Sequence, residues 1–161
     1  MTTKDAIDTL DRIDDLFGEL SNNLIYVCEE LPSLGVTREV EQKIVDHCCA
    51  SLERLVEADK NLQRIACSLK GNVDRIPQSS LHLPESTCRT IATAAKEIGV
   101  TVQSMQGLDA EYRSLARQES TLTQLSVILK DSGETLEKLF DRMRKEIDAL
   151  LGGEVYHGSS V

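Results

Sequence analysis

The chain has 161 residues, of which 40% are hydrophobic and only 3% are aromatic, with no Trp. This length is enough for one domain with a moderate core, and a core poor in aromatic residues is typical of packed helices, whose interfaces fill with Leu, Ile, Val and Ala. The formal net charge is −9, so the chain lacks the cationic track needed to bind nucleic acid or an anionic membrane surface.

The first predicted helix spans residues 4–31. Thr2 or Thr3 can cap its start, and Pro32 ends it. Apolar residues recur along it in steps of three and four, which places them on one stripe of a helix. These residues are Leu10, Ile13, Phe17, Leu20, Leu24, Val27 and Leu31.

A short connection leads to a second predicted helix over residues 38–76, capped by Thr37 and stopped by Pro77. The short connection favours an antiparallel hairpin. The stripe of the second helix is long and narrow, which is typical of a surface that packs against another helix. Its members are Cys48, Leu52, Leu55, Asp59, Leu62, Ala66, Leu69, Val73 and Ile76.

Asp59 is the polar exception in this stripe. A polar residue at such a position lowers stability but can fix the register and the choice of partner. Alternatively, the stripe drifts around the helix and Asp59 reaches solvent. The sequence leaves both interpretations open.

Two further helices are predicted over residues 86–106 and 109–151. The phase of the stripe slips near Gly107, which indicates either a stammer or a break there. The segment 131–134 is interpreted as either a kink or a new helix cap. After Gly107, the stripe is predicted to follow Tyr112, Leu115, Glu119, Leu122, Ser126 and Leu129. The predicted fold is all-α: an elongated antiparallel bundle or coiled coil of three to four long helices. Residues 1–151 form one domain, and residues 152–161 are predicted to be a disordered tail.

The last helix carries a candidate partner-binding stripe. Lys and Arg residues flank it, and an apolar stripe bordered by charge favours a defined helical partner. The alternative is that the stripe packs on the chain's own first two helices. The candidate residues are Leu136, Phe140, Met143, Ile147 and Leu150.

No motif predicts catalysis, a cofactor or a metal site. Consecutive helical residues point about 100° apart, so His47, Cys48 and Cys49 cannot converge on one ion. His82 and Cys88 are too few to form a metal site. The sequence contains no phosphate-binding loop and no arrangement of a nucleophilic triad. An acidic group on the first helix is interpreted as a solvated face or a docking face for a basic partner; it comprises Asp8, Asp11, Asp14, Asp15 and Glu19.

Five Cys, an odd number, without paired spacing indicate a reducing compartment, the cytoplasm or the nucleus. No signal peptide is expected at the start, and no apolar run is long enough to span a membrane. In general type the chain is similar to small helical subunits of eukaryotic complexes. We therefore expect a non-enzymatic scaffold or adaptor subunit that packs with other helical subunits in a hetero-oligomer. The alternative is a bundle chaperone or carrier that shields a partner helix or a lipid.

Overall fold

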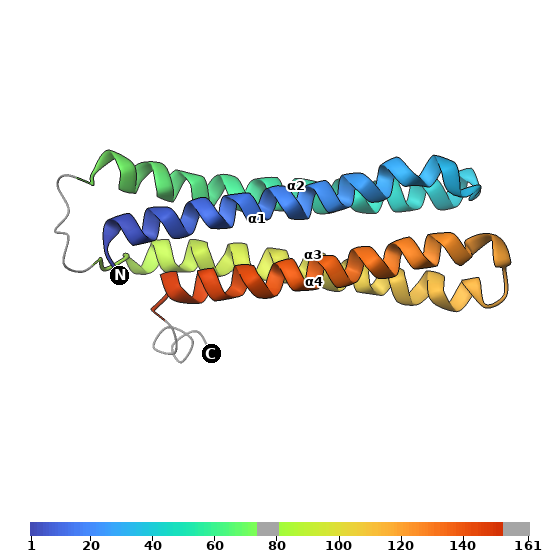
Figure 1. Ribbon diagram of the computed structural model, residues 1–161. Helices are drawn as coiled ribbons and strands as arrows, with labels where there is room; N and C mark the ends of the chain where they lie inside the picture. The colour runs from blue at the N-terminus through green and yellow to red at the C-terminus, as the bar shows by residue number, and fades with distance from the viewer. Residues whose placement is uncertain (74–80, 153–161) are drawn as a thin grey trace.

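The computed structural model describes residues 1–73 and 81–152. It contains four long helices: α1 (Thr3–Glu30), α2 (Arg38–Gly71), α3 (Glu85–Ala116) and α4 (Thr123–Leu150). Two short 3-10 helices, Leu31–Leu34 and Ser120–Leu122, lie in the connections, and the described residues include no strand (Figure 1). The predicted all-α bundle is confirmed, with four helices.

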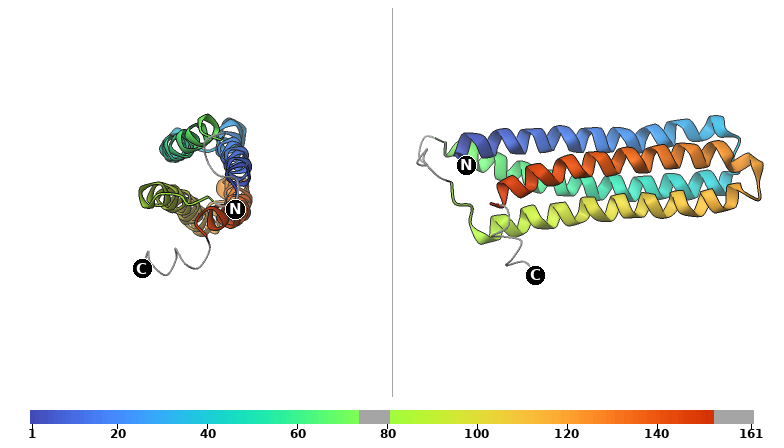
Figure 2. Two further views of the ribbon diagram at one scale, coloured as in Figure 1. Left: turned by 90° about the vertical axis from the view of Figure 1, so that its left-hand side faces the viewer. Right: turned by 60° about the horizontal axis from the view of Figure 1, so that its bottom comes forward.

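The helices run alternately up and down and form two hairpins, α1–α2 and α3–α4, that lie side by side (Figures 1 and 2). Each helix packs against two others: α1 against α2 and α4, and α3 against α2 and α4. The four helices therefore enclose one core along the length of the bundle.

The core consists of the predicted stripes. Leu10, Leu24, Leu62, Ile98 and Leu129 are each completely buried, and they come from all four helices. Burying one such side chain contributes roughly 1.5–3 kcal/mol. Burial of these stripes explains why amphipathic helices with modest intrinsic propensity form here.

Side-chain caps fix where the first two helices begin. The Thr2 hydroxyl accepts a hydrogen bond from the backbone N–H of Asp5 at 3.1 Å, and the Asp5 carboxylate accepts one from the N–H of Thr2 at 3.0 Å. Thr37 caps α2 by accepting from the N–H of Val40 at 3.3 Å. Between these helices, Gly35 adopts φ 69°, a left-handed conformation that side chains disfavour. The hairpin is thus encoded locally.

The structure corrects two predicted helix ends. Helix α2 ends at Gly71 rather than at residue 76, and Asn72 and Val73 form a turn. Ile76, the predicted last member of the α2 stripe, lies outside the described residues. The predicted break at Gly107 is wrong, because α3 runs without interruption from Glu85 to Ala116.

Gly107→Ala should therefore stabilise the protein. Gly107 is exposed inside α3, and an added Cβ would meet no atom within 4 Å. Alanine restricts the unfolded chain and favours the helix, so we expect a gain of about 0.5–1 kcal/mol in the free energy of unfolding, measured by urea denaturation. Gly35→Ala is the matched control and should destabilise the protein, since Gly35 has a positive φ. A loss of stability in Gly107→Ala would contradict a continuous α3.

The real break follows α3. Arg117 and Gln118 form a turn, and Glu119 is extended with φ −124° and ψ 109°. Two predicted members of the stripe are therefore misplaced: Leu115 is 41% exposed, and Glu119 lies in the connection. Ser126 is half-buried, whereas its neighbour Leu125 is completely buried. The phase of the core stripe is reset across this connection.

Helix α4 is continuous through residues 131–134, so this segment is not the cap of a new helix. Further along α4, the ring of Phe140 packs against Gly99 of α3, and an added Cβ on Gly99 would lie 3.4 Å from the ring. This is an ordinary van der Waals distance, so an alanine would fit at position 99. The predicted disordered tail lies outside the described residues, apart from Gly152.

Candidate docking groove between α1 and α2

The predicted partner-binding stripe of α4 lies in the bundle's own core. Leu136 and Met143 are completely buried, Ile147 and Leu150 are nearly so, and Phe140 is half-buried. A partner could reach these side chains only by displacing another helix of the bundle. Binding of a partner at this stripe stays a prediction.

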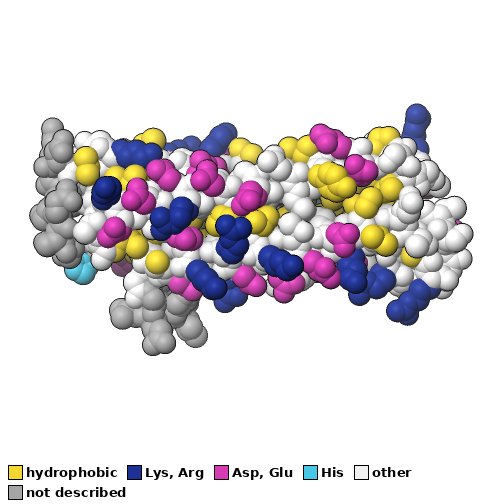
Figure 3. Space-filling model, in the orientation of Figure 1, with side chains coloured by type: hydrophobic (Ala, Val, Ile, Leu, Met, Phe, Trp, Pro, Cys, Tyr) yellow, Lys and Arg dark blue, Asp and Glu magenta, His cyan; other side chains and the backbone are white. Residues whose placement is uncertain are grey.

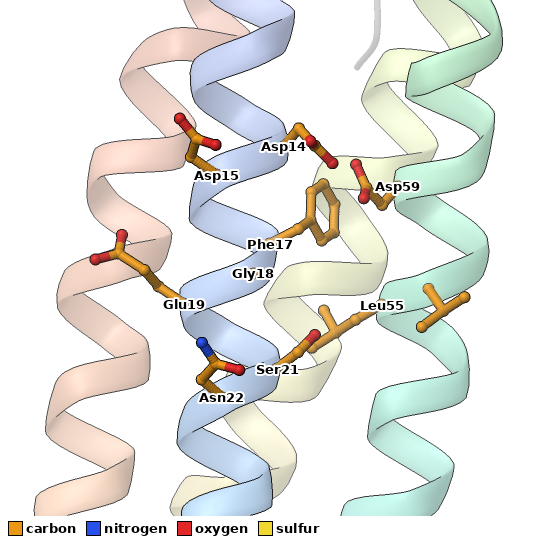
Figure 4. A pocket seen from close by; sticks show the side chains of 10 residues that line it. Asp14, Asp15, Phe17, Gly18, Glu19, Ser21, Asn22, Leu55 and Asp59 are labelled. Atoms are coloured by element: carbon orange, nitrogen blue, oxygen red, sulfur yellow. The ribbon is translucent and has the colours of Figure 1, made fainter.

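Asp59, the second predicted functional residue, is half-buried on α2, and its carboxyl group faces Asp14 of α1 (Figure 4). Oδ1 of Asp59 is buried, and no hydrogen bond from the described residues reaches it. A buried acceptor without a partner costs about 1–3 kcal/mol. The Asp14–Asp59 pair therefore lowers the stability of the α1–α2 interface.

Burial is the main cause that raises the pKa of Asp59 to about 7. The nearby carboxyl group of Asp14 contributes by hydrogen bonding and by charge repulsion, while the side chain of Gln63 acts in the opposite direction. Near pH 7, Asp59 is thus partly protonated. A cation placed between Asp14 and Asp59 would favour the ionised form of Asp59 instead.

Asp59→Asn should abolish a pH dependence of stability. Between about pH 4 and pH 7 the folded chain retains a proton that the unfolded chain has lost, so the free energy of unfolding falls as the pH rises through this range. Asn cannot ionise. We expect the variant to be more stable than the wild type by on the order of 1–2 kcal/mol at about pH 8, allowing for solvent screening, and equally stable near pH 4.

Thermal melts across this pH range measure the effect. Asp15→Asn is the matched control, because Asp15 is exposed on the same helix and points away from Asp59 (Figure 4). A wild type whose stability is constant over this range would contradict the raised pKa of Asp59.

The two carboxyl groups lie at a surface hollow of about 380 Å³ between α1 and α2. Apolar side chains form part of its wall: Phe17, Leu55 and Val56. Small residues of α1, Gly18 and Ser21, form another part. The rest of the lining is Asp14, Asp15, Glu19, Asn22 and Asp59, so the hollow contains four acidic residues and no Lys or Arg.

Helical periodicity places further residues on the same face of α1 and α2, between this hollow and the α1–α2 turn. Ile25 lies two turns after Gly18 on α1, while Cys49 and Leu52 lie two turns before Val56 and Asp59 on α2, so each continues the same face. Ile25 is 42% exposed and Val56 is 47% exposed. We call this surface the α1–α2 groove; its residues are Asp14, Gly18, Ser21, Ile25, Cys28, Val45, Cys49, Leu52, Val56 and Asp59.

Two of the other interfaces between helices have opposite charges paired at the surface. Arg12 of α1 contacts Glu146 of α4 at 3.0 Å, and Lys43 of α2 contacts Glu111 of α3 at 2.6 Å. Figure 3 shows basic and acidic side chains interspersed over the face that contains α1 and α4. In the α1–α2 groove, a like-charged pair takes the place of such a contact, although Lys70 and Asp11 form an ion pair beyond it at 3.3 Å.

No comparison identifies the chain. Family models, curated proteins and solved structures were all compared with it, and none matches. Among the described residues, no helix has the length and apolar character needed to cross a membrane.

The metal candidates do not assemble in the described part of the chain, where no group of three or more His, Cys, Asp and Glu could hold an ion. His47 instead contacts the Ser104 hydroxyl at 3.3 Å. His82 and Cys88 do line a common hollow of about 320 Å³ at one end of the bundle, together with Met1 and Leu150. Burial raises the pKa of the Cys88 thiol, which keeps it protonated.

Cys28 and Cys48 meet across the α1–α2 interface. Burial raises the pKa of both thiols, and the hydrogen bond between them raises the pKa of Cys48 further while it lowers that of Cys28. Raised pKa values disfavour the reactive thiolate, so this pair fits a packing role better than a redox role.

Proposed function

We propose that the chain is a non-enzymatic helical adaptor subunit that binds another helical protein in a hetero-oligomeric complex. The observation that carries this proposal is the α1–α2 groove, where Ile25 and Val56 are exposed beside half-buried apolar residues. Amphipathic helices bind grooves of this kind with their apolar faces. The net charge of −9 and the intracellular location predicted from the sequence fit a basic partner in the cytoplasm or the nucleus.

The experiment is purification of the intact chain at native expression, followed by native mass spectrometry of the complex. We expect a helical protein at fixed stoichiometry. Ile25→Arg and Val56→Arg should abolish the complex, because each places a charge on the groove. The matched control, Val127→Arg, changes an exposed apolar residue of α4 and should retain the complex.

The carrier alternative predicts a different result from the same preparation. A carrier would hold a lipid or release its client, and no protein would be present at fixed stoichiometry. Solubility of the chain alone does not separate the two functions, because the four helices already bury their apolar stripes on one another. A complex that survives both groove substitutions would contradict docking at the groove.

A further inference from the structure

We propose that the α1–α2 groove docks an amphipathic helix of a partner protein, and that a Lys or Arg of this helix inserts between Asp14 and Asp59. This inference rests on the adaptor function proposed above and adds the surface and the chemistry of the partner. Its basis is the combination of an open apolar groove with an uncompensated acidic pair at one end.

The shape of the groove fits a helix. Gly18 and Ser21 are small, so they leave space beside α1. An added Cβ at Gly18 would meet no atom within 4 Å. The distance between packed helices depends on the side chains at the contact, so small residues allow a partner helix to approach closely. Ile25 and Val56 then present exposed apolar surface to that helix.

The charge of the groove selects the partner. Asp14 and Asp59 point toward each other (Figure 4), and the Oδ1 atom of Asp59 is buried without a hydrogen bond from the described residues. An ammonium or guanidinium group at this position would donate to both carboxylates and remove their repulsion. The opposite-charge contacts on other sides of the bundle show what the α1–α2 groove lacks.

Two other occupants complement the groove less well. Residues 153–161 of the chain contain no Lys or Arg. A second copy bound about a two-fold axis at the acidic pair would bring two such pairs together. A basic helix of a different protein is the occupant that complements the groove.

Two synthetic helical peptides of about 20 residues test the inference with the full chain. Both carry one apolar face of Leu and Ala, and they differ at a single central position, Lys in one and Glu in the other. We expect the Lys peptide to bind about tenfold more tightly or better. In NMR titrations it should shift the amide signals of Gly18, Ser21 and Val56.

Variants assign the preference to the acidic pair. The double variant Asp14→Asn, Asp59→Asn should bind both peptides equally, and Asp8→Asn, at an exposed position of α1 outside the hollow, should keep the wild-type preference. Circular dichroism shows whether each variant is folded. Equal affinities for the two peptides in the wild-type chain, shifts that map outside the groove, a preference unchanged in the double variant or no binding by either peptide would overturn the inference.

A photo-crosslinker placed at Val56, with Val127 as the matched control site, tests docking at the groove separately from the adaptor function. We expect crosslinking from Val56 to a partner helix that contains a Lys or Arg. Replacing that residue with Glu should weaken binding, and Asp59→Lys should restore it. A partner captured only from Val127 would overturn the inference and keep the adaptor function, whereas absence of any protein partner would overturn both.

Discussion

Deleting residues 133–161 should unfold the whole bundle. The deletion removes Leu136, Met143, Ile147 and Leu150 from the core, and α1 and α3 lose the helix that covers them. Each buried aliphatic side chain contributes roughly 1.5–3 kcal/mol, while a whole domain is stable by only about 5–15 kcal/mol. Far-ultraviolet circular dichroism should show loss of most helix and no cooperative melting.

The shorter deletion 153–161 is the control and should leave the melting transition unchanged, because it spares α4. A folded bundle that lacks residues 133–161 but no longer binds its partner would contradict this expectation. That outcome would support the prediction from the sequence that the apolar stripe of α4 docks a partner.

Leu62→Asp should lower the stability of the protein far more than Asp8→Ala. Leu62 is completely buried on α2, and an unpaired charge there costs roughly 3–5 kcal/mol. For a chain of this length, this corresponds to a fall of about 6–20 °C in melting temperature. Asp8→Ala, at an exposed position of α1, should change stability within about 0.5 kcal/mol. Equal melting temperatures in differential scanning calorimetry would show that Leu62 is not in the core.

The first two helices were predictable because several local signals agree. Thr2 and Thr37 supply side-chain caps, Pro32 and Gly35 mark the turn, and each stripe keeps its phase over many residues. The end of α2 was placed too late, because Val73 and Ile76 continue the apolar pattern. The apolar periodicity of one helix does not show where the neighbouring helix ends and packing stops.

The helices of the second half were harder to predict, because the connection between α3 and α4 contains no strong helix-breaking residue. Gly107 reads as a breaker, yet one glycine costs only about 1 kcal/mol in a helix whose other face is buried. The true connection contains neither Gly nor Pro. Leu122 and Leu125 carry the only sequence signal, since they restart the core stripe in a different phase from Leu115.

The groove could be predicted only in part. Asp59 was visible as a polar residue in an apolar stripe, and Asp14 was visible as a member of an acidic face. The sequence did not show that they meet, because this depends on the register of α1 against α2. Their heptad positions contain that information: each lies beside the core stripe on the side that faces the other helix.

The alternation of helix direction has a practical consequence for labelling. The first turn of α1 and the last turn of α4 lie at the same end of the bundle, and the Arg12–Glu146 ion pair holds the two helices together near it (Figure 1). A fluorophore attached before Thr3 and another attached after Leu150 would therefore sit close together and exchange energy efficiently. Loss of that signal would report separation of α1 from α4 in a living cell, and neither probe would touch the α1–α2 hairpin turn.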